Sequence, residues 1–434
     1  MVQEEECLRI MTPMQNPPSS LWANRLRQNQ GIRSLMEDLG QVTGHPDEIL
    51  LGGGNPAHIP EAEAIFAEAF QSLAKDPKLG ALLGDYQAPI GNDRFRSLAA
   101  EFLSPHLGAD LRKDNIAFFN GSQNAYSYLL NIHSGKMMDG SFKKILLPIV
   151  PDYIGYADQS IEADAFLATK PEVIRTGNRR FRYGLNKTEF DLSIVGCVAL
   201  SRPTNPTGNI LSNKDIEWVE ERTQKQKLPL LIDLAYGNPF PNLIGQEEPI
   251  HYREGRTLSL SFSKIGLPGV RLGIVVSDPD TIETLSAYAA VGNLAVGNLG
   301  VYLMEILFRK EILTNLAKNI LRPFYDKKRE LAIAIFESEF QKHGIEYEIH
   351  DPMGGFFLWI RFPNLSVTNH KLYHLCKDKR LFIVSGHYFF PGLNSDFSHT
   401  QDCIRLTYCR PEEELARGAH ILAEIIASHQ TKSE

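Results

Sequence analysis

In the stretch Leu258-Ser-Leu-Ser-Phe-Ser-Lys-Ile-Gly-Leu-Pro-Gly-Val-Arg-Leu-Gly-Ile-Val-Val276, two apolar runs flank a single lysine. The runs Leu258–Phe262 and Leu272–Val276 have the length and composition of buried β-strands. The loop Ser263–Arg271 joins them and is too short for the crossover that parallel neighbours need. We therefore predict that the second strand runs antiparallel to the first, with Lys264 just beyond the end of the first.

Further apolar runs of strand length precede this pair. Enough residues for a crossover helix lie between most of them, which indicates a mainly parallel sheet covered by helices on both faces. The predicted fold class is therefore α/β, with one antiparallel strand in a large domain over residues 61–315. The earlier runs are Ile116–Phe119, Ile145–Val150, Ile194–Leu200 and Leu228–Ile232.

Beyond about residue 315 the pattern changes to a long helical stretch, short strand runs and a final helix, which predicts a smaller α+β domain over residues 316–434. We expect residues 21–60 to pack on this small domain. Residues 1–20 lack the basic start and apolar run of a signal peptide and are expected to form a disordered leader. The runs are Arg322–His343, Ile345–His350, Gly355–Phe362, Ile383–Ser385, Ile404–Tyr408 and the helix from Pro411.

Composition narrows the functional classes. The net charge of −7 comes without a basic block, which argues against nucleic acid and anionic membranes as partners. The five cysteines show no C-x-x-C spacing, which favours a reducing, cytoplasmic setting. The uncharged segment Thr284–Met304 is diluted by Gly292, Asn293 and Gly297. It is predicted to be a helix buried against the core or a subunit partner, rather than a membrane span.

Lys264 has the setting of a nucleophile. A lysine at the end of a buried strand loses hydration, which lowers its pKa and makes the amine able to attack an aldehyde. Ser261, Ser263 and Arg271 supply hydrogen-bond donors suited to a phosphate. The plain alternative is a lysine whose ammonium reaches solvent from the strand end, and this motif alone does not decide between the two.

Asp233 closes another apolar strand run and needs a partner there, which a protonated pyridine nitrogen would supply. Tyr236 and Asn205 could both donate to the phenolic oxygen of the same ring, Asn205 from a rigid Asn-Pro turn. Each has an ordinary alternative: a helix N-cap or ion pair for Asp233, and a simple turn for Asn205.

Three further groups follow strand runs or lie in them. Gly121, Ser122 and Gln123 open an apolar helix, whose free N–H groups make a phosphate site. Tyr153 could stack on a planar cofactor, and Arg405 could bind a substrate carboxylate through two hydrogen bonds. The alternatives are a serine N-cap, a packing tyrosine and an exposed strand arginine.

Taken in order, these motifs resemble the fold-type-I pyridoxal-phosphate-dependent aminotransferases, from about residue 30 to the C-terminus. The motifs are Tyr86, Gly121-Ser122-Gln123, Tyr153, Asn205-Pro-Thr-Gly, Asp233-x-x-Tyr236, Ser261-x-Ser-Lys264, Arg271 and Arg405. Longer runs resemble the valine–pyruvate branch of that family: Leu51-Gly-Gly-Gly-Asn-Pro-Ala, Tyr153-Ile-Gly-Tyr-Ala-Asp, Ser201-Arg-Pro-Thr-Asn-Pro-Thr-Gly-Asn, Lys264-Ile-Gly-Leu-Pro-Gly and Phe389-Phe-Pro-Gly-Leu.

The resemblance implies a role for each motif residue around pyridoxal 5′-phosphate. Lys264 would bind the aldehyde and move the proton between Cα and C4′, with Asp233 on the ring nitrogen. The other implied roles are Asn205 and Tyr236 on the phenolic oxygen, Tyr153 stacked on the ring, Gly121, Ser122, Gln123, Ser261 and Arg271 at the phosphate, and Gly54, Asn205 and Arg405 at the substrate carboxylate. Tyr86 would reach the phosphate of a neighbouring subunit, which implies a homodimer. No metal is implied.

Two departures from the family pattern bear on these roles. The loop from Lys264 to Arg271 is one residue shorter than in most members, which affects Arg271 as a phosphate ligand. After Tyr86 the chain reads Gln87-Ala88-Pro89, where a glycine often follows closely.

The implied activity is transamination between an amino acid and a 2-oxo acid, most directly valine and pyruvate giving 2-oxoisovalerate and alanine by a ping-pong mechanism. A C–S lyase or a cyclopropane-forming synthase would use the same cofactor and shares these motifs. A ligand-sensing regulator built on an aminotransferase-like body would need a DNA-binding domain, for which the residues before the body are too few and too acidic. A catalytically inactive binding protein would usually have lost Lys264 or Asp233, and both are present.

Overall fold

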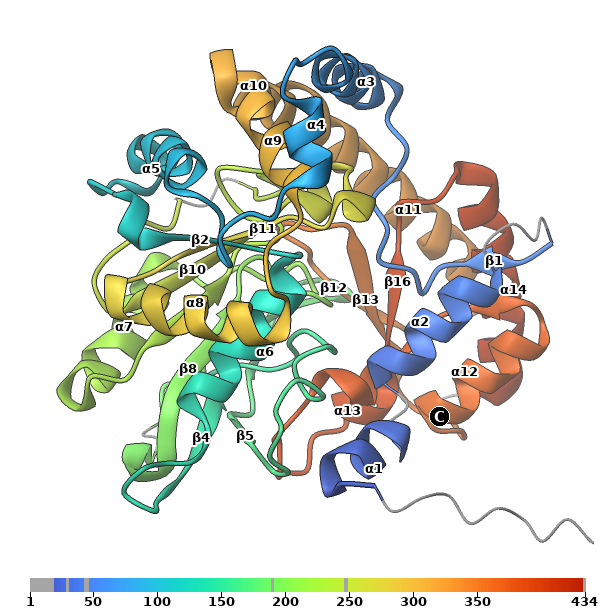
Figure 1. Cartoon of the computed structure of the whole chain (residues 1–434). Helices are drawn as coiled ribbons and strands as arrows, with labels where there is room; N and C mark the ends of the chain where they lie inside the picture. The colour runs from blue at the N-terminus through green and yellow to red at the C-terminus, as the bar shows by residue number, and fades with distance from the viewer. Residues whose placement is uncertain (1–18, 29–30, 43–46, 189–190, 246–248, 432–434) are drawn as a thin grey trace, which may run out of the picture.

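The structure is a computed structural model that describes residues 19–28, 31–42, 47–188, 191–245 and 249–431. Most of the leader expected over residues 1–20 lies outside these ranges. Within them, two main sheets and the helices around them form the body of the molecule (Figure 1).

The larger sheet contains the strands predicted around Lys264. Its order is β2-β11-β10-β9-β8-β4-β3, and β5 also pairs with β4. Strands β10, β9, β8 and β4 run parallel, while β11 runs antiparallel to β10 with Ser261 opposite Gly273, as predicted. The strands are β2 (Ile116–Phe119), β3 (Gly135–Lys136), β4 (Phe142–Leu147), β5 (Phe166–Ala168), β8 (Val195–Ser201), β9 (Leu230–Asp233), β10 (Arg256–Ser261) and β11 (Gly273–Val276).

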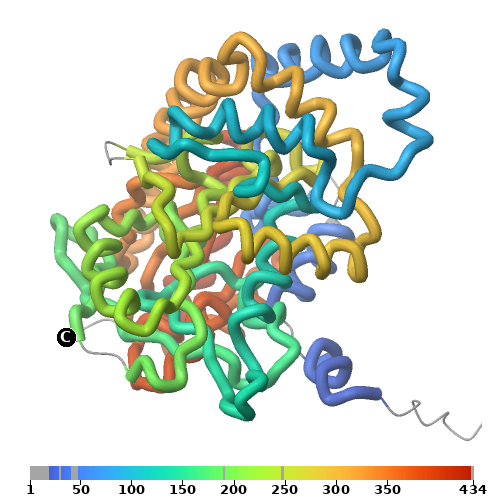
Figure 2. Tube along the Cα trace, turned by 60° about the vertical axis from the view of Figure 1, so that its left-hand side comes forward, coloured from blue at the N-terminus to red at the C-terminus, as the bar shows by residue number. Residues whose placement is uncertain are grey.

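Helices pack on this sheet and extend beyond it. Helix α6 contacts β2, β4, β8, β10 and β11, while α5 and α8 contact β2. Figures 1 and 2 show α3 and α4 beside α9 at one end of the molecule. The predicted α/β fold class is confirmed. The helices are α3 (Pro60–Ala74), α4 (Leu79–Gly84), α5 (Asp93–Leu107), α6 (Ser122–His133), α7 (Asn213–Thr223), α8 (Pro279–Gly292), α9 (Asn298–Phe308) and α10 (Ile312–Leu316).

The second sheet has the order β15-β16-β13-β12-β7-β6. The C-terminal region supplies β12 (Glu348–His350), β13 (Phe357–Arg361), β14 (Leu381–Phe382), β15 (Val384–Ser385), β16 (Cys403–Thr407), α11 (Arg322–Lys342), α12 (Asn369–Asp378), α13 (His399–Asp402) and α14 (Glu412–His429). The hairpin of β6 (Glu172–Gly177) and β7 (Arg180–Gly184) lies within 61–315, yet β7 pairs in parallel with β12. The domain boundaries stay predictions.

The N-terminal segment contacts the C-terminal region. Strand β1 (Ile49–Leu50) pairs in parallel with β14, and α2 (Gly31–Val42) follows the short helix α1 (Leu21–Gln28). The Asp38 carboxylate on α2 accepts hydrogen bonds from the Tyr373 hydroxyl at 2.5 Å and the Lys377 ammonium at 2.7 Å. These contacts hold α2 against α12.

The segment Thr284–Met304 forms two helices, α8 and α9, and not the single buried helix expected. Gly292 ends α8 and Gly297 is the N-cap of α9, so the glycines that diluted the segment also interrupt it. In α9, Val301, Leu303 and Met304 are buried but Leu299 is 44% exposed, and Val291 of α8 is 91% exposed. Among the described residues, no helix is long and apolar enough to cross a membrane.

Candidate active site

A cavity of about 640 Å³ lies at the carboxyl ends of the parallel strands, where ligands bind in open α/β sheets. It brings together eleven of the thirteen residues predicted for the site: Gly54, Ser122, Gln123, Tyr153, Asn205, Asp233, Tyr236, Ser261, Lys264, Arg271 and Arg405. Gly121 directly precedes the cavity residue Ser122. Tyr86 is the one predicted residue that lies elsewhere.

Lys264 follows β10 in a short 3-10 turn, Phe262–Ile265, which turns its side chain into the cavity. Its Nζ donates a hydrogen bond to the Gly54 carbonyl at 2.9 Å. Burial lowers the pKa of Lys264 to about 8. About a tenth of the amine is therefore neutral at pH 7, and able to act as a nucleophile or a base, far more than for an ordinary lysine.

Asp233 ends β9 as a buried carboxylate with no ion pair among the described residues. Its Oδ1 accepts from the Ala235 backbone N–H at 2.9 Å, and its Oδ2 from the Tyr156 hydroxyl at 3.1 Å. Burial raises the pKa of Asp233 to about 6, while these two hydrogen bonds oppose the rise. A protonated pyridine nitrogen would give this buried carboxylate the cationic partner that it lacks among the described residues.

Arg405 enters the cavity from β16 and is 1% exposed. Its Nη1 donates to Asn205 Oδ1 at 2.9 Å and its Nη2 to the Gly52 carbonyl at 2.6 Å, whereas its buried Nε has no hydrogen-bond partner. Burial lowers the pKa of Arg405 to about 10, so the guanidinium stays charged at neutral pH. The site thus holds a fixed cation suited to a carboxylate.

Another group of lining residues has the character of a phosphate site. Helix α6 begins at Ser122, so its first N–H groups are available there. Arg271 donates to Ser263 Oγ and to the Asn120 carbonyl, both at 3.3 Å. Gly121 has φ 92°, and a Cβ there would lie 2.3 Å from Arg271 Nη2, so only glycine admits the guanidinium.

Two tyrosines complete the predicted set. The buried Tyr236 hydroxyl has no hydrogen-bond partner, and an unpaired buried donor of this kind fits an absent acceptor. Burial raises the pKa of Tyr153 to about 12, and the ring of Tyr153 meets that of Tyr156 edge-on at 5.3 Å. The hydrogen-bond donors around the start of α6, the Asp233 carboxylate without an ion pair and the unpaired Tyr236 hydroxyl match the phosphate, the ring nitrogen and the phenolic oxygen of pyridoxal phosphate.

Tyr86 lies on the surface after α4 and is 83% exposed. Exposed apolar side chains near the α4–α9 end of the molecule include Leu83 at 73% and Leu294 at 59%. One chain alone does not bring Tyr86 to the cavity, and its role across a dimer stays a prediction.

The apolar wall of the cavity was not predicted; α2 supplies it through Ile32, Leu35, Met36 and Leu39. Their i, i+3, i+4, i+7 spacing could have revealed an amphipathic helix, but not the surface that it covers. Roles for Tyr126 and Tyr156 were also not predicted; Tyr156 lies in the run Tyr153-Ile-Gly-Tyr-Ala-Asp, but the run itself does not show what the Tyr156 hydroxyl contacts. All six line the cavity.

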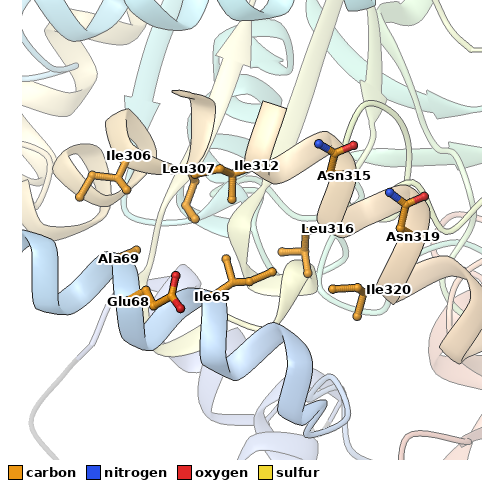
Figure 3. A pocket seen from close by; sticks show the side chains of 10 residues that line it. All are labelled: Ile65, Glu68, Ala69, Ile306, Leu307, Ile312, Asn315, Leu316, Asn319 and Ile320. Carbon is orange, nitrogen blue, oxygen red and sulfur yellow. The ribbon is translucent and has the colours of Figure 1, made fainter. Parts of the chain in front are cut away.

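Other candidate sites lie apart from this chemistry. A second cavity of about 490 Å³ lies between α3 and the segment from α9 onward, and Glu68 is its only titratable lining residue (Figure 3). Glu339, His343 and His420 cluster on α11 and α14, but Lys342 already pairs with Glu339 at 2.5 Å. Neither contains a residue predicted for catalysis.

Comparison with known proteins places this geometry in a family. Residues 185–422 match the family model "Aminotransferase class I and II". The chain is 35% identical to valine–pyruvate aminotransferase of Escherichia coli K12, over 94% of this chain and 97% of that protein.

Two solved structures agree in fold and sequence. Valine-pyruvate aminotransferase AvtA of Salmonella typhimurium LT2 gives a TM-score of 0.83 at 35% identity, covering 91% of this chain and 98% of that one. A Psychrobacter arcticum 273-4 protein gives a TM-score of 0.88 at 34% identity, covering 95% and 99%. This chain therefore belongs to the class I and II aminotransferases, enzymes that use pyridoxal 5′-phosphate.

Proposed function

We propose that this aminotransferase transfers the amino group of valine to pyruvate, giving 2-oxoisovalerate and alanine by a ping-pong mechanism. The observation that carries the proposal is that Lys264, Asp233 and Arg405 meet in one cavity beside the apolar wall of α2. A small aliphatic side chain suits that wall, whereas a charged one would lose hydration there without a partner. The identity to the valine–pyruvate enzymes of two bacteria supports the same substrates.

We assign each end of the cavity to one anion. Gly121, Ser122, Gln123, Ser261 and Arg271 hold the cofactor phosphate through the start of α6 and the guanidinium. Their chemistry matches a phosphate because backbone N–H groups, hydroxyls and an arginine all donate.

The other end binds the substrate carboxylate through Arg405, with Gly54 and Asn205 beside it. Asn205 Oδ1 already accepts from Arg405, so the amide nitrogen of Asn205 is left to donate to the phenolic oxygen of the cofactor. The unpaired Tyr236 hydroxyl donates to the same oxygen, and Tyr153 stacks on the ring.

Lys264 moves the proton. Pyridoxal phosphate supplies the electron sink for the pair released when the Cα–H bond breaks. With its pKa lowered to about 8 by burial, the Lys264 amine takes the Cα proton and returns it at C4′. Asp233, as a carboxylate, keeps the ring nitrogen protonated.

We further propose a cytoplasmic homodimer in which Tyr86 reaches the phosphate of the neighbouring subunit. The exposed side chains of Leu83, Tyr86, Val291 and Leu294 support such an interface. The division into residues 61–315 and 316–434, with 21–60 on the smaller part, is kept as part of this proposal.

The test incubates the holoenzyme with valine and pyruvate and measures alanine and 2-oxoisovalerate. Lys264→Ala should still bind the cofactor but lose about 10²–10⁴-fold in turnover, the range for a positioned acid–base group. Lys379→Ala is the control, because Lys379 is an exposed lysine directly after α12 (Asn369–Asp378) and does not line the cavity. Normal turnover in Lys264→Ala would refute the assignment, and a wild-type enzyme that forms no alanine from valine and pyruvate would favour the lyase or synthase alternative.

A further inference from the structure

Tyr156 is the only side chain that donates a hydrogen bond to Asp233 among the described residues. Its hydroxyl lies 3.1 Å from Asp233 Oδ2, whereas Oδ1 is served by the backbone of Ala235. Tyr156 comes from the turn after β4, 77 residues earlier in the chain. The carboxylate is therefore held by two independent parts of the fold.

The hydrogen bond opposes the effect of burial on Asp233. Burial raises the pKa of Asp233 to about 6, which favours the neutral acid, and the Tyr156 hydrogen bond favours the ionised form. Only the ionised carboxylate can form an ion pair with a protonated ring nitrogen. Tyr156 therefore acts on the group that controls the charge of the cofactor ring.

The phenol of Tyr156 is fixed as a donor. Burial raises the pKa of Tyr156 well above its ordinary value, so the hydroxyl keeps its proton. Its ring stacks on Tyr126 of α6, with centroids 5.1 Å apart and planes 17° apart. A second ring contact, edge-on with Tyr153 at 85°, further limits the freedom of Tyr156 to turn away from Asp233.

We propose that Tyr156 is a positioning residue that keeps Asp233 ionised and aimed at the ring nitrogen of pyridoxal phosphate. Two tyrosines of the same turn then have different roles. Tyr153 would contact the face of the cofactor's pyridine ring, and Tyr156 would orient the Asp233 carboxylate that meets the nitrogen at the edge of that ring. The inference rests on the proposed roles of Lys264 and Asp233.

The test compares pyridoxal phosphate with its 1-deaza analogue, in which a C–H group replaces the ring nitrogen. Dissociation constants of both ligands are measured on the full-length apoprotein for wild type and Tyr156→Phe. Below pH 6, where Asp233 is mostly protonated without the cofactor, the variant should bind pyridoxal phosphate about tenfold more weakly, equivalent to about one pKa unit on Asp233, and should change analogue binding less than about twofold. A second readout is the acid limb of kcat/KM for valine, which should move to higher pH in the variant.

Tyr183→Phe is the matched control, because the buried Tyr183 hydroxyl bonds to His399 of α13 and Trp359 of β13, neither of which lines the cavity. It should affect thermal stability without separating the two ligands. Equal losses on both ligands in Tyr156→Phe, or none on either, overturn the inference. Wild type that binds pyridoxal phosphate with no preference over the analogue contradicts instead the assigned role of Asp233.

Discussion

Replacing Gly121 with alanine tests the phosphate end of the site at a single atom. The added Cβ would lie 2.3 Å from Nη2 and 2.8 Å from Cζ of Arg271. Contacts of a Cβ below 3.0 Å essentially do not occur, so the guanidinium must move by at least about 0.7 Å. That movement takes the guanidinium out of the position in which it bonds to Ser263 Oγ and the Asn120 carbonyl.

The size of the effect follows from two separate terms. A hydrogen bond to a charged group contributes about 1.5–3 kcal/mol, so losing one from the phosphate weakens cofactor binding roughly 10- to 150-fold. The backbone at Gly121, φ 92° and ψ 156°, lies in a region that is essentially restricted to glycine. Alanine there should also cost about 1–3 kcal/mol of the free energy of unfolding.

The assay measures pyridoxal phosphate affinity by titrating the apoprotein, and stability by thermal unfolding, on the same samples. Gly255→Ala separates the two terms: Gly255 has φ 85° but no heavy atom within 4 Å of a built Cβ. It should lose stability and keep its affinity. If Gly121→Ala bound the cofactor as wild type does, the phosphate could not lie between α6 and Arg271.

Three more perturbations test other parts of the site. Arg405→Lys replaces a guanidinium, which can bind a carboxylate through two hydrogen bonds, by a single ammonium. It should raise the KM for valine about 10- to 100-fold with a smaller change in kcat. An unchanged KM would mean that the substrate carboxylate binds elsewhere. Burial lowers the pKa of Lys264 to about 8, and only the neutral amine can attack the aldehyde. The rate at which the apoprotein binds the cofactor covalently should therefore rise about tenfold per pH unit below pH 8 and level off above it. A flat profile between pH 6 and 8 would contradict this. Mixing Tyr86→Ala with Lys264→Ala subunits should restore activity through hybrid dimers with one intact site, which will not happen if Tyr86 acts within its own chain.

The strands and their ends could be predicted because the signals are local. The short loop Ser263–Arg271 dictates the antiparallel direction of β11, and polar residues after apolar runs predicted the position of Lys264 and Asp233. The β6–β7 hairpin could not be assigned, because its partner β12 lies more than 160 residues further on and every residue of β6 is exposed. Strand β7 does alternate, with Phe181 and Tyr183 buried, but this pattern does not show which strand it pairs with.

The apolar wall and Tyr156 could not be predicted for a related reason. Helix α2 reaches the cavity because Asp38 is tied to Tyr373 and Lys377, two residues more than 330 positions away. The amphipathic spacing on α2 indicates a buried face without indicating what it faces. Tyr156 acquires its role only when β4 and β9 place its hydroxyl beside Asp233.

The charges in the cavity link the two roles of Lys264. Among the described lining residues, Asp233 is the only acid, whereas Lys264, Arg271 and Arg405 are basic. Burial is the main cause of the low pKa of Lys264, but Arg405 and Arg271 also lower it. A bound phosphate neutralises the charge of Arg271, and a bound carboxylate neutralises that of Arg405. Each anion therefore removes one cationic neighbour that lowers the pKa of Lys264, so this pKa rises when the anions bind. The same amine is therefore the better nucleophile before the two anions bind, and the stronger base once both are in place.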